Sequence, residues 1–158
     1  MARILGQYFW RQTFPDLQKW ALSSGAESRE RAIEASGAPI EPADARATRE
    51  EMFALVRNPK TDEEVRHRLA LKIGASSDDA EVEALIQEHD KSGDDRTRLL
   101  WAAAVFAARS PKSAPLLARY ARQSPDEQMR VGARAELVDL LGETAATALL
   151  EDEKIIKK

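Results

Sequence analysis

An aspartate followed four residues later by an arginine recurs at a fixed interval in this 158-residue chain. The pair stands at positions 62 and 66, at 94 and 98, and at 126 and 130, so each copy follows the previous one after 32 residues. Apolar positions keep the same register, in columns formed by Leu71, Ala103 and Ala135, by Ile73, Val105 and Leu137, by Val82, Ala114 and Ala146, and by Leu85, Leu117 and Leu149. Self-similarity at a period of roughly 20 to 50 residues is the signature of repeat proteins, whose units bury their apolar faces by stacking.

Within each 32-residue unit the local signals are those of helices. Capping boxes are expected at Thr48 and Thr61, and glycines stand where helices would end, at Gly37, Gly74, Gly93 and Gly142. The chain has no alternating run of β-branched and aromatic residues between tight-turn dipeptides, which strands would require. The pattern predicts helices at 3–13, 15–24, 26–36, 49–57, 62–73, 78–90, 95–109, 113–123, 126–141 and 144–153. We therefore expect an all-α fold, a short α-solenoid of about three helical hairpins with an N-terminal helical cap.

The repeat fades upstream of residue 48, and the stretch 36–44 holds two prolines and a glycine with little periodicity. This predicts an N-terminal helical cap or interaction segment at 1–47, repeats at 48–153, and a frayed tail at 154–158.

The repeated residues resemble the HEAT-like helical repeat family, in particular its short bacterial form related to phycobilin-lyase repeats. One full copy reads Asp62 to Arg66, Leu69-Ala70, Ile73-Gly74, Val82 and Leu85-Ile86, and a third copy begins at Asp126. The middle copy departs from this pattern, because Thr97 replaces the aliphatic residue before Arg98 and no glycine follows Val105. The resemblance covers about 48–153 and implies a fold rather than an activity, since that family includes scaffolds, assembly factors, lyases and DNA-binding members.

Composition excludes several classes of protein. The chain has no cysteine, which excludes disulfide scaffolds, thiolate metal sites and cysteine nucleophiles. No apolar stretch is long enough to span a membrane, and the first residues make a poor signal peptide, so we expect a cytoplasmic protein. The net charge is −3, and no nucleic-acid partner is expected.

Candidate catalytic and cofactor-binding residues are missing from the sequence. The two histidines, His67 and His89, stand 22 positions apart and have no metal-motif partner, and no phosphate-binding loop or nucleophile elbow occurs. We expect no enzyme activity, no metal and no cofactor. The arginines at 66, 98 and 130 could form a ladder for anions, although dipole and side-chain pairing effects favour a structural role.

Two segments are candidates for binding a partner. Apolar side chains cover every face of the helix at 95–109, which predicts either complete burial or a concave apolar groove. On the groove interpretation His67, Arg68, Leu100, Ala104 and Arg134 are expected to be exposed, with Trp101 as an anchor. If Trp101 belongs to the core instead, its replacement by alanine should cost about 3 to 5 kcal/mol.

The second segment is the aromatic N-terminus, which includes Tyr8, Phe9 and Trp10. It would serve either as the cap of the stack or as an interaction helix. We expect a non-catalytic adaptor or assembly module that binds another protein, with self-association possible. The alternatives are a ligand-handling protein of the lyase or chaperone type and, less favoured, a nucleic-acid-binding protein.

Overall fold

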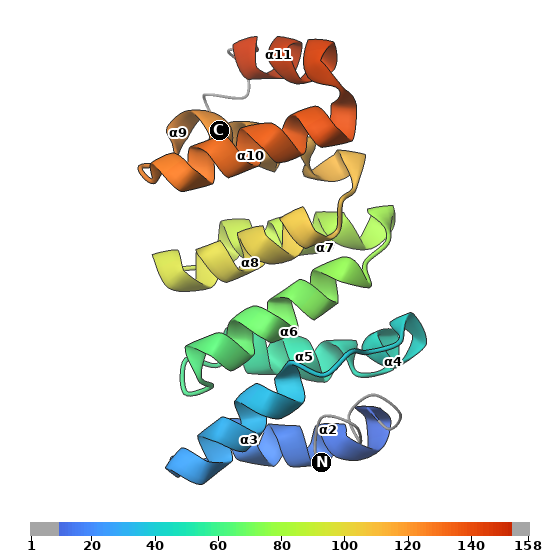
Figure 1. Ribbon diagram of the computed structural model, residues 1–158, viewed down its shortest axis with the longest axis vertical. Helices are drawn as coiled ribbons and strands as arrows, with labels where there is room; N and C mark the ends of the chain where they lie inside the picture. Colours follow the sequence, from blue (N-terminus) through green and yellow to red (C-terminus); the bar gives the residue numbers. More distant parts are fainter. Residues whose placement is uncertain (1–9, 153–158) are drawn as a thin grey trace.

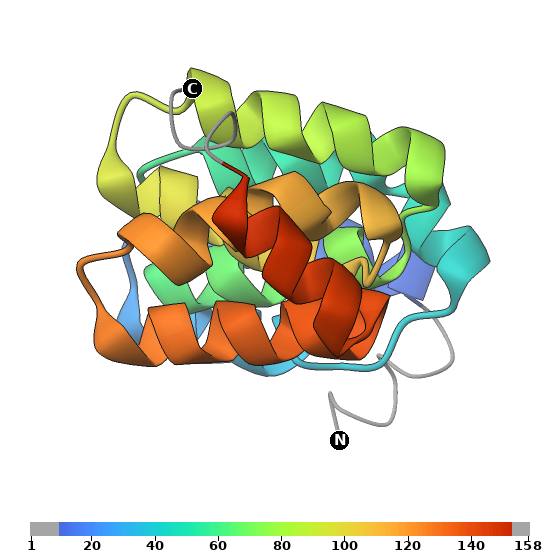
Figure 2. The same cartoon turned by 90° about the horizontal axis from the view of Figure 1, so that it is seen from above.

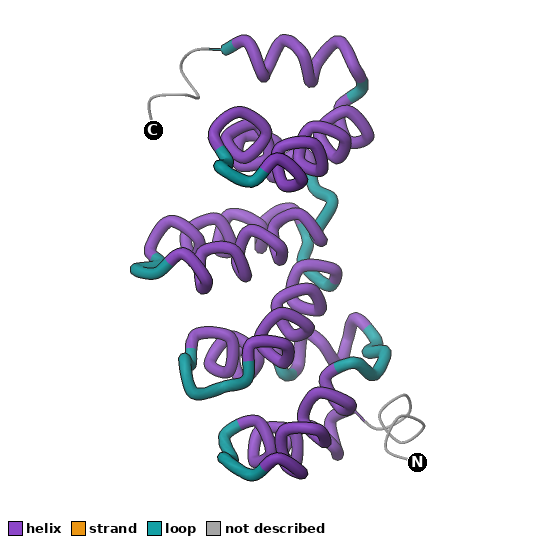
Figure 3. The backbone as a smooth tube through the Cα atoms, turned by 60° about the vertical axis from the view of Figure 1, so that its left-hand side comes forward, coloured by secondary structure: helices purple, strands orange, loops and turns teal. Residues whose placement is uncertain are grey.

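The computed structural model describes residues 10–152, and all regular secondary structure in that range is helical (Figure 3). The helices are α2 (Trp10–Ala21), α3 (Ala26–Ser36), α4 (Pro42–Ala47), α5 (Arg49–Arg57), α6 (Glu63–Ala75), α7 (Asp79–Lys91), α8 (Asp95–Ala107), α9 (Ala114–Gln123), α10 (Glu127–Leu141) and α11 (Glu143–Glu151), with a 3-10 turn, η1 (Pro111–Ser113), before α9. The all-α expectation is confirmed for these residues.

The helices form two layers, and within each layer they are stacked along the long axis of the molecule (Figure 1). The front layer consists of α3, α6, α8 and α10, and the back layer of α2, α5, α7 and α9; Figure 2 shows α6 and α10 on one side and α5 and α7 on the other. Each front helix packs against the back helix that precedes it in the chain, α6 on α5, α8 on α7 and α10 on α9. The sequence predicted that each acid-capped helix pairs with the helix that follows it. In the structure each acid-capped helix pairs instead with the helix that precedes it.

The aspartates and the arginines that recur every 32 residues both have structural roles at helix ends. Asp62, Asp94 and Asp126 are the N-cap residues of α6, α8 and α10, and their carboxylates accept backbone N–H bonds from Glu64 (2.9 Å), Thr97 (2.8 Å) and Met129 (3.0 Å). An acidic N-cap satisfies an orphan donor and complements the helix dipole.

The repeated arginines reach back to the end of the preceding helix. Arg66 donates to the carbonyl oxygen of Val56 at 2.7 Å, near the end of α5. Arg98 and Arg130 donate to the carbonyl oxygens of Ser92 (3.0 Å) and Ser124 (2.8 Å), directly after α7 and α9. These bonds satisfy carbonyls that helix ends leave without a partner. The guanidinium groups are thus engaged by the fold, which supports the structural role over an anion ladder.

Helices α6 and α8 approach one another until their backbones touch. A Cβ atom at Gly74 would stand 2.0 Å from the carbonyl oxygen of Ala104, so only glycine fits there. The expectation that Gly74 ends a helix is wrong, because α6 continues to Ala75. The same repeat positions one unit later are Phe106 and Glu136, whose side chains prevent a comparable approach of α8 and α10.

The buried apolar side chains form two clusters. The larger cluster extends from Trp10 to Leu116. It contains residues on both sides of position 48, where the sequence predicted that the N-terminal segment ends. The smaller cluster lies among α9, α10 and α11. Phe106 and Tyr120 pack against both, with ring centroids 5.5 Å apart and the rings perpendicular.

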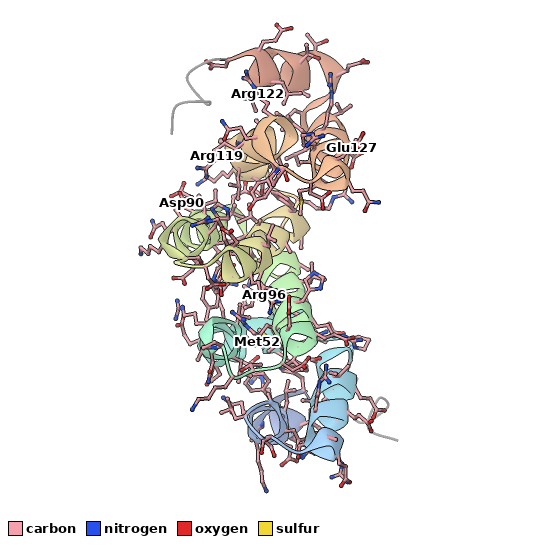
Figure 4. The ribbon with its side chains drawn as sticks, turned by 90° about the vertical axis from the view of Figure 1, so that its left-hand side faces the viewer. Met52, Asp90, Arg96, Arg119, Arg122 and Glu127 are labelled. Carbon is pink, nitrogen blue, oxygen red and sulfur yellow. The ribbon has the colours of Figure 1, made fainter. Side chains whose placement is uncertain are left out.

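Polar contacts also join successive back helices. His89 on α7 is buried, with Nε2 3.0 Å from the hydroxyl oxygen of Tyr120 on α9 and Nδ1 2.9 Å from the carboxylate of Asp90. Asp90 also accepts a bond from Arg119 at 3.0 Å, and Figure 4 shows these two side chains next to each other. Burial lowers the pKa of His89 from its ordinary value, with Arg119 and Arg98 adding to the effect and Asp90 opposing it.

The close approach at Gly74 predicts opposite results for two Gly→Ala substitutions. Gly74→Ala should lower the free energy of unfolding by about 3 kcal/mol, because the new methyl group overlaps the Ala104 carbonyl. Gly132→Ala on α10 meets no atom within 4 Å and should raise it by about 0.5 to 1 kcal/mol through helix propensity. Chemical denaturation of both variants tests this; equal effects would contradict the backbone contact.

The burial of His89 predicts an acid-sensitive fold. The unfolded chain binds a proton at this histidine near its ordinary pKa of about 6.5, whereas the folded chain resists it, so stability falls as the pH drops through that value. Denaturation of the wild type at about pH 7.5 and 5.5 should show a larger loss than denaturation of His89→Gln. His67→Gln removes an exposed histidine and should behave like the wild type, while equal losses in all three proteins would contradict the prediction.

Candidate partner-binding cleft between α8 and α10

The front layer is less closely packed between α8 and α10, where Phe106 and Glu136 stand at the positions that correspond to Gly74 and Ala104. Helices α6 and α8 pack directly, whereas α8 and α10 barely touch. Between them lies a cleft of about 650 Å³. Its lining residues are Leu71 from α6; Ala103, Phe106 and Ala107 from α8; Arg109, two residues after α8; and Asp126, Gln128, Met129, Gly132, Ala133 and Glu136 from α10 and its N-cap.

Most residues that line the cleft are apolar, and several of them are small. The small ones are Ala103 and Ala107 from α8 and Gly132 and Ala133 from α10, and the larger apolar ones are Leu71, Phe106 and Met129. Small residues on facing helices leave room for a side chain from outside.

The charged groups at the rim already have partners. Arg109 is 3.5 Å from the Glu136 carboxylate and also hydrogen-bonds Asp139, and the Asp126 carboxylate caps α10. The cleft therefore offers an apolar surface with compensated charges around it. This arrangement suits the burial of an apolar side chain better than acid–base chemistry.

A second hollow of about 580 Å³ continues the cleft toward α3 and α6, and the two share Ala103 and Met129. Its other lining residues are Arg29, Asp62, Glu63, Glu64, His67, Arg96, Leu99 and Leu100. Leu99 is 45% exposed, and Leu71 at the edge of the cleft is 38% exposed. Ion pairs stand beside them, Arg29 with Asp62 at 2.6 Å and Arg96 with Glu63 at 3.4 Å. We call the cleft and this hollow together the front groove.

The structure buries several residues that the sequence placed on the binding surface. Leu100 is 6% exposed and Ala104 is fully buried, so the expectation that they are exposed is wrong. Trp101 is 1% exposed, and its ring centroid lies 4.9 Å from that of Phe53. The reason is that both α6 and α7 pack against α8. Leu99 is the exposed large apolar side chain of this helix.

The remaining candidates lie apart from one another. His67 is exposed and lines the second hollow, whereas Arg134 is exposed on α10 in a shallow depression with Val131 and Val138. Arg68 is half-buried, donates to the Ile33 carbonyl oxygen at 3.1 Å and pairs with Glu64.

Of the N-terminal aromatics, Tyr8 and Phe9 lie outside the described residues. Trp10 is buried, and its indole N–H donates to the hydroxyl oxygen of Thr48 at 2.8 Å. Sequence reasoning missed Leu71, Met129 and Gly132 as groove residues. The signal that could have found the cleft is the change from Gly74 to Phe106 within one repeat column.

The residues described, 10 to 152, contain no group of three His, Asp or Glu side chains placed to hold a metal ion. Over the same range no helix is both long and apolar enough to cross a membrane. Comparison with protein-family models, with curated proteins and with solved structures found no match to this chain.

Proposed function

We propose that this protein is a short α-solenoid of HEAT-like helical hairpins that acts as a non-catalytic adaptor and binds another protein in its front groove. The repeat interpretation is supported by the three acid caps and the three back-reaching arginines, which serve the same purpose in successive units. Units that share these contacts stack in one direction and present a rigid surface to a partner.

The observation that carries the binding proposal is the front groove itself. It is continuous across the four front helices, has a mainly apolar lining in the cleft and exposes Leu71 and Leu99 beside paired charges. An apolar centre with a polar, charge-compensated rim is the composition of protein interfaces. A groove between helices accepts the apolar face of an amphipathic helix, which is the partner element we favour.

The non-catalytic part of the proposal rests on the groups around the groove. Its carboxylates pair with arginines or cap helices, as Glu63, Asp62 and Glu136 do. A general acid or base needs a carboxylate whose environment is set for proton transfer rather than for pairing.

The groove predicts that a charge at Ala103 blocks partner binding. Ala103 lines both hollows, so Ala103→Glu would place an unpaired carboxylate in the docking surface and should weaken partner capture at least about tenfold. Ala84→Glu, an exposed position on α7 in the back layer, is the matched control and should bind normally.

The measurement is photo-crosslinking in the native host, with a photoreactive amino acid at position 103 or 84, combined with quantitative capture of the two glutamate variants. A protein that crosslinks at 103 alone and is lost from Ala103→Glu supports the front groove. Equal crosslinking at both positions, or undiminished capture by a folded Ala103→Glu protein, would contradict it.

A further inference from the structure

A third hollow, of about 550 Å³, lies where α6 passes the end of α3 and the start of α4. Its lining residues are Ser36, Gly37, Pro39, Ile40, Pro42, Arg68, Leu71, Lys72, Ala75 and Ser76. Two of them are cations on successive turns of α6, and none is acidic. In a chain with 27 acidic and 24 basic residues, a pocket with cations alone is unusual.

The charge of Lys72 has no carboxylate partner among the described residues. Its ammonium group donates to the carbonyl oxygen of Ala38 and stands 5.6 Å from the centroid of the Trp10 ring. Arg68, in contrast, is paired with Glu64. The pocket therefore contains one positive charge that the described part of the protein compensates only by a carbonyl dipole and a ring.

This environment disfavours the protonated form of Lys72. Burial lowers the pKa of Lys72 to about 8, and the nearby charge of Arg68 adds to the effect. A bound anion would oppose both influences and favour the protonated amine. The lysine is thus suited to gain a counter-ion from a ligand.

We propose that this pocket binds a small organic monocarboxylate, with the carboxylate paired to Lys72 and the apolar part of the ligand against Ile40, Pro42 and Leu71. A single uncompensated cation matches a single negative charge. The apolar lining matches a hydrocarbon chain or ring, and the volume lies in the range of small-molecule sites. This inference is independent of the proposed adaptor function, because the front groove and this pocket share only Leu71.

Hexanoate is the probe, with hexanol as its neutral counterpart and inorganic phosphate as an anion without an apolar part. Titration calorimetry of the full chain at neutral pH should show binding of hexanoate that is at least about tenfold tighter than that of hexanol or phosphate. Lys72→Met keeps the apolar stem and should weaken hexanoate binding by a similar factor. Lys91→Met, at the exposed end of α7, should leave binding unchanged.

A measurement on the unmutated protein covers the case in which Lys72→Met does not fold. The ¹³Cε resonance of Lys72 should titrate near pH 8 in the free protein and at a higher pH with saturating hexanoate. The proposal is overturned if hexanoate leaves the Lys72 titration unchanged, if hexanol or phosphate binds as tightly, or if a folded Lys72→Met protein keeps its affinity.

Discussion

The front layer is organised by one backbone contact, the approach of α6 to α8 at Gly74 and Ala104. Helices can come this close only where the side chains between them are minimal. The contact between α6 and α8 brings Ile73, Trp101 and Val105 into one core. The next front interface lacks this contact. The residues at the corresponding positions of α8 and α10, Phe106 and Glu136, are too large for such a contact. The core divides into two clusters there, and a cleft lies between α8 and α10.

Side-chain hydrogen bonds link successive helices within the back layer. Successive back helices are linked by Arg57 with Glu88 at 2.8 Å, by Arg119 with Asp90 at 3.0 Å and by His89 with Tyr120 at 3.0 Å. Each joins residues 29 to 31 positions apart in the chain. Exposed ion pairs contribute little individually, about 0 to 1 kcal/mol, so their main effect is to fix how one back helix sits on the next. These charged residues are thus engaged by the fold and say little about a ligand.

The sequence predicted the helices well, because caps and prolines act locally. Helix α3 and helix α5 have the expected bounds, and Gly142 ends α10 with a φ of +81°.

The sequence predicted a break between two helices before Pro15, but α2 continues through this proline. The N–H group that proline lacks would have bonded the carbonyl oxygen of Arg11, which is an exposed residue. Thr48 is the N-cap residue of α5 as expected, but its side chain makes no capping hydrogen bond to α5. Its hydroxyl oxygen accepts a hydrogen bond from Trp10, a contact between distant residues that no local pattern reveals. The burial of Leu100 and Ala104 and the cleft beside them depend in the same way on how close neighbouring helices lie.

The most direct test of this account is whether the cleft is open in solution. With ¹³C-methyl alanine and a soluble paramagnetic agent, the methyl groups of Ala103 and Ala107, which line the cleft, should relax faster than those of Ala70 on α6 and Ala104 on α8, which are fully buried. Equal protection of all four methyl groups would mean that α8 and α10 close as tightly as α6 and α8. In that case neither the division of the core nor the front groove would stand.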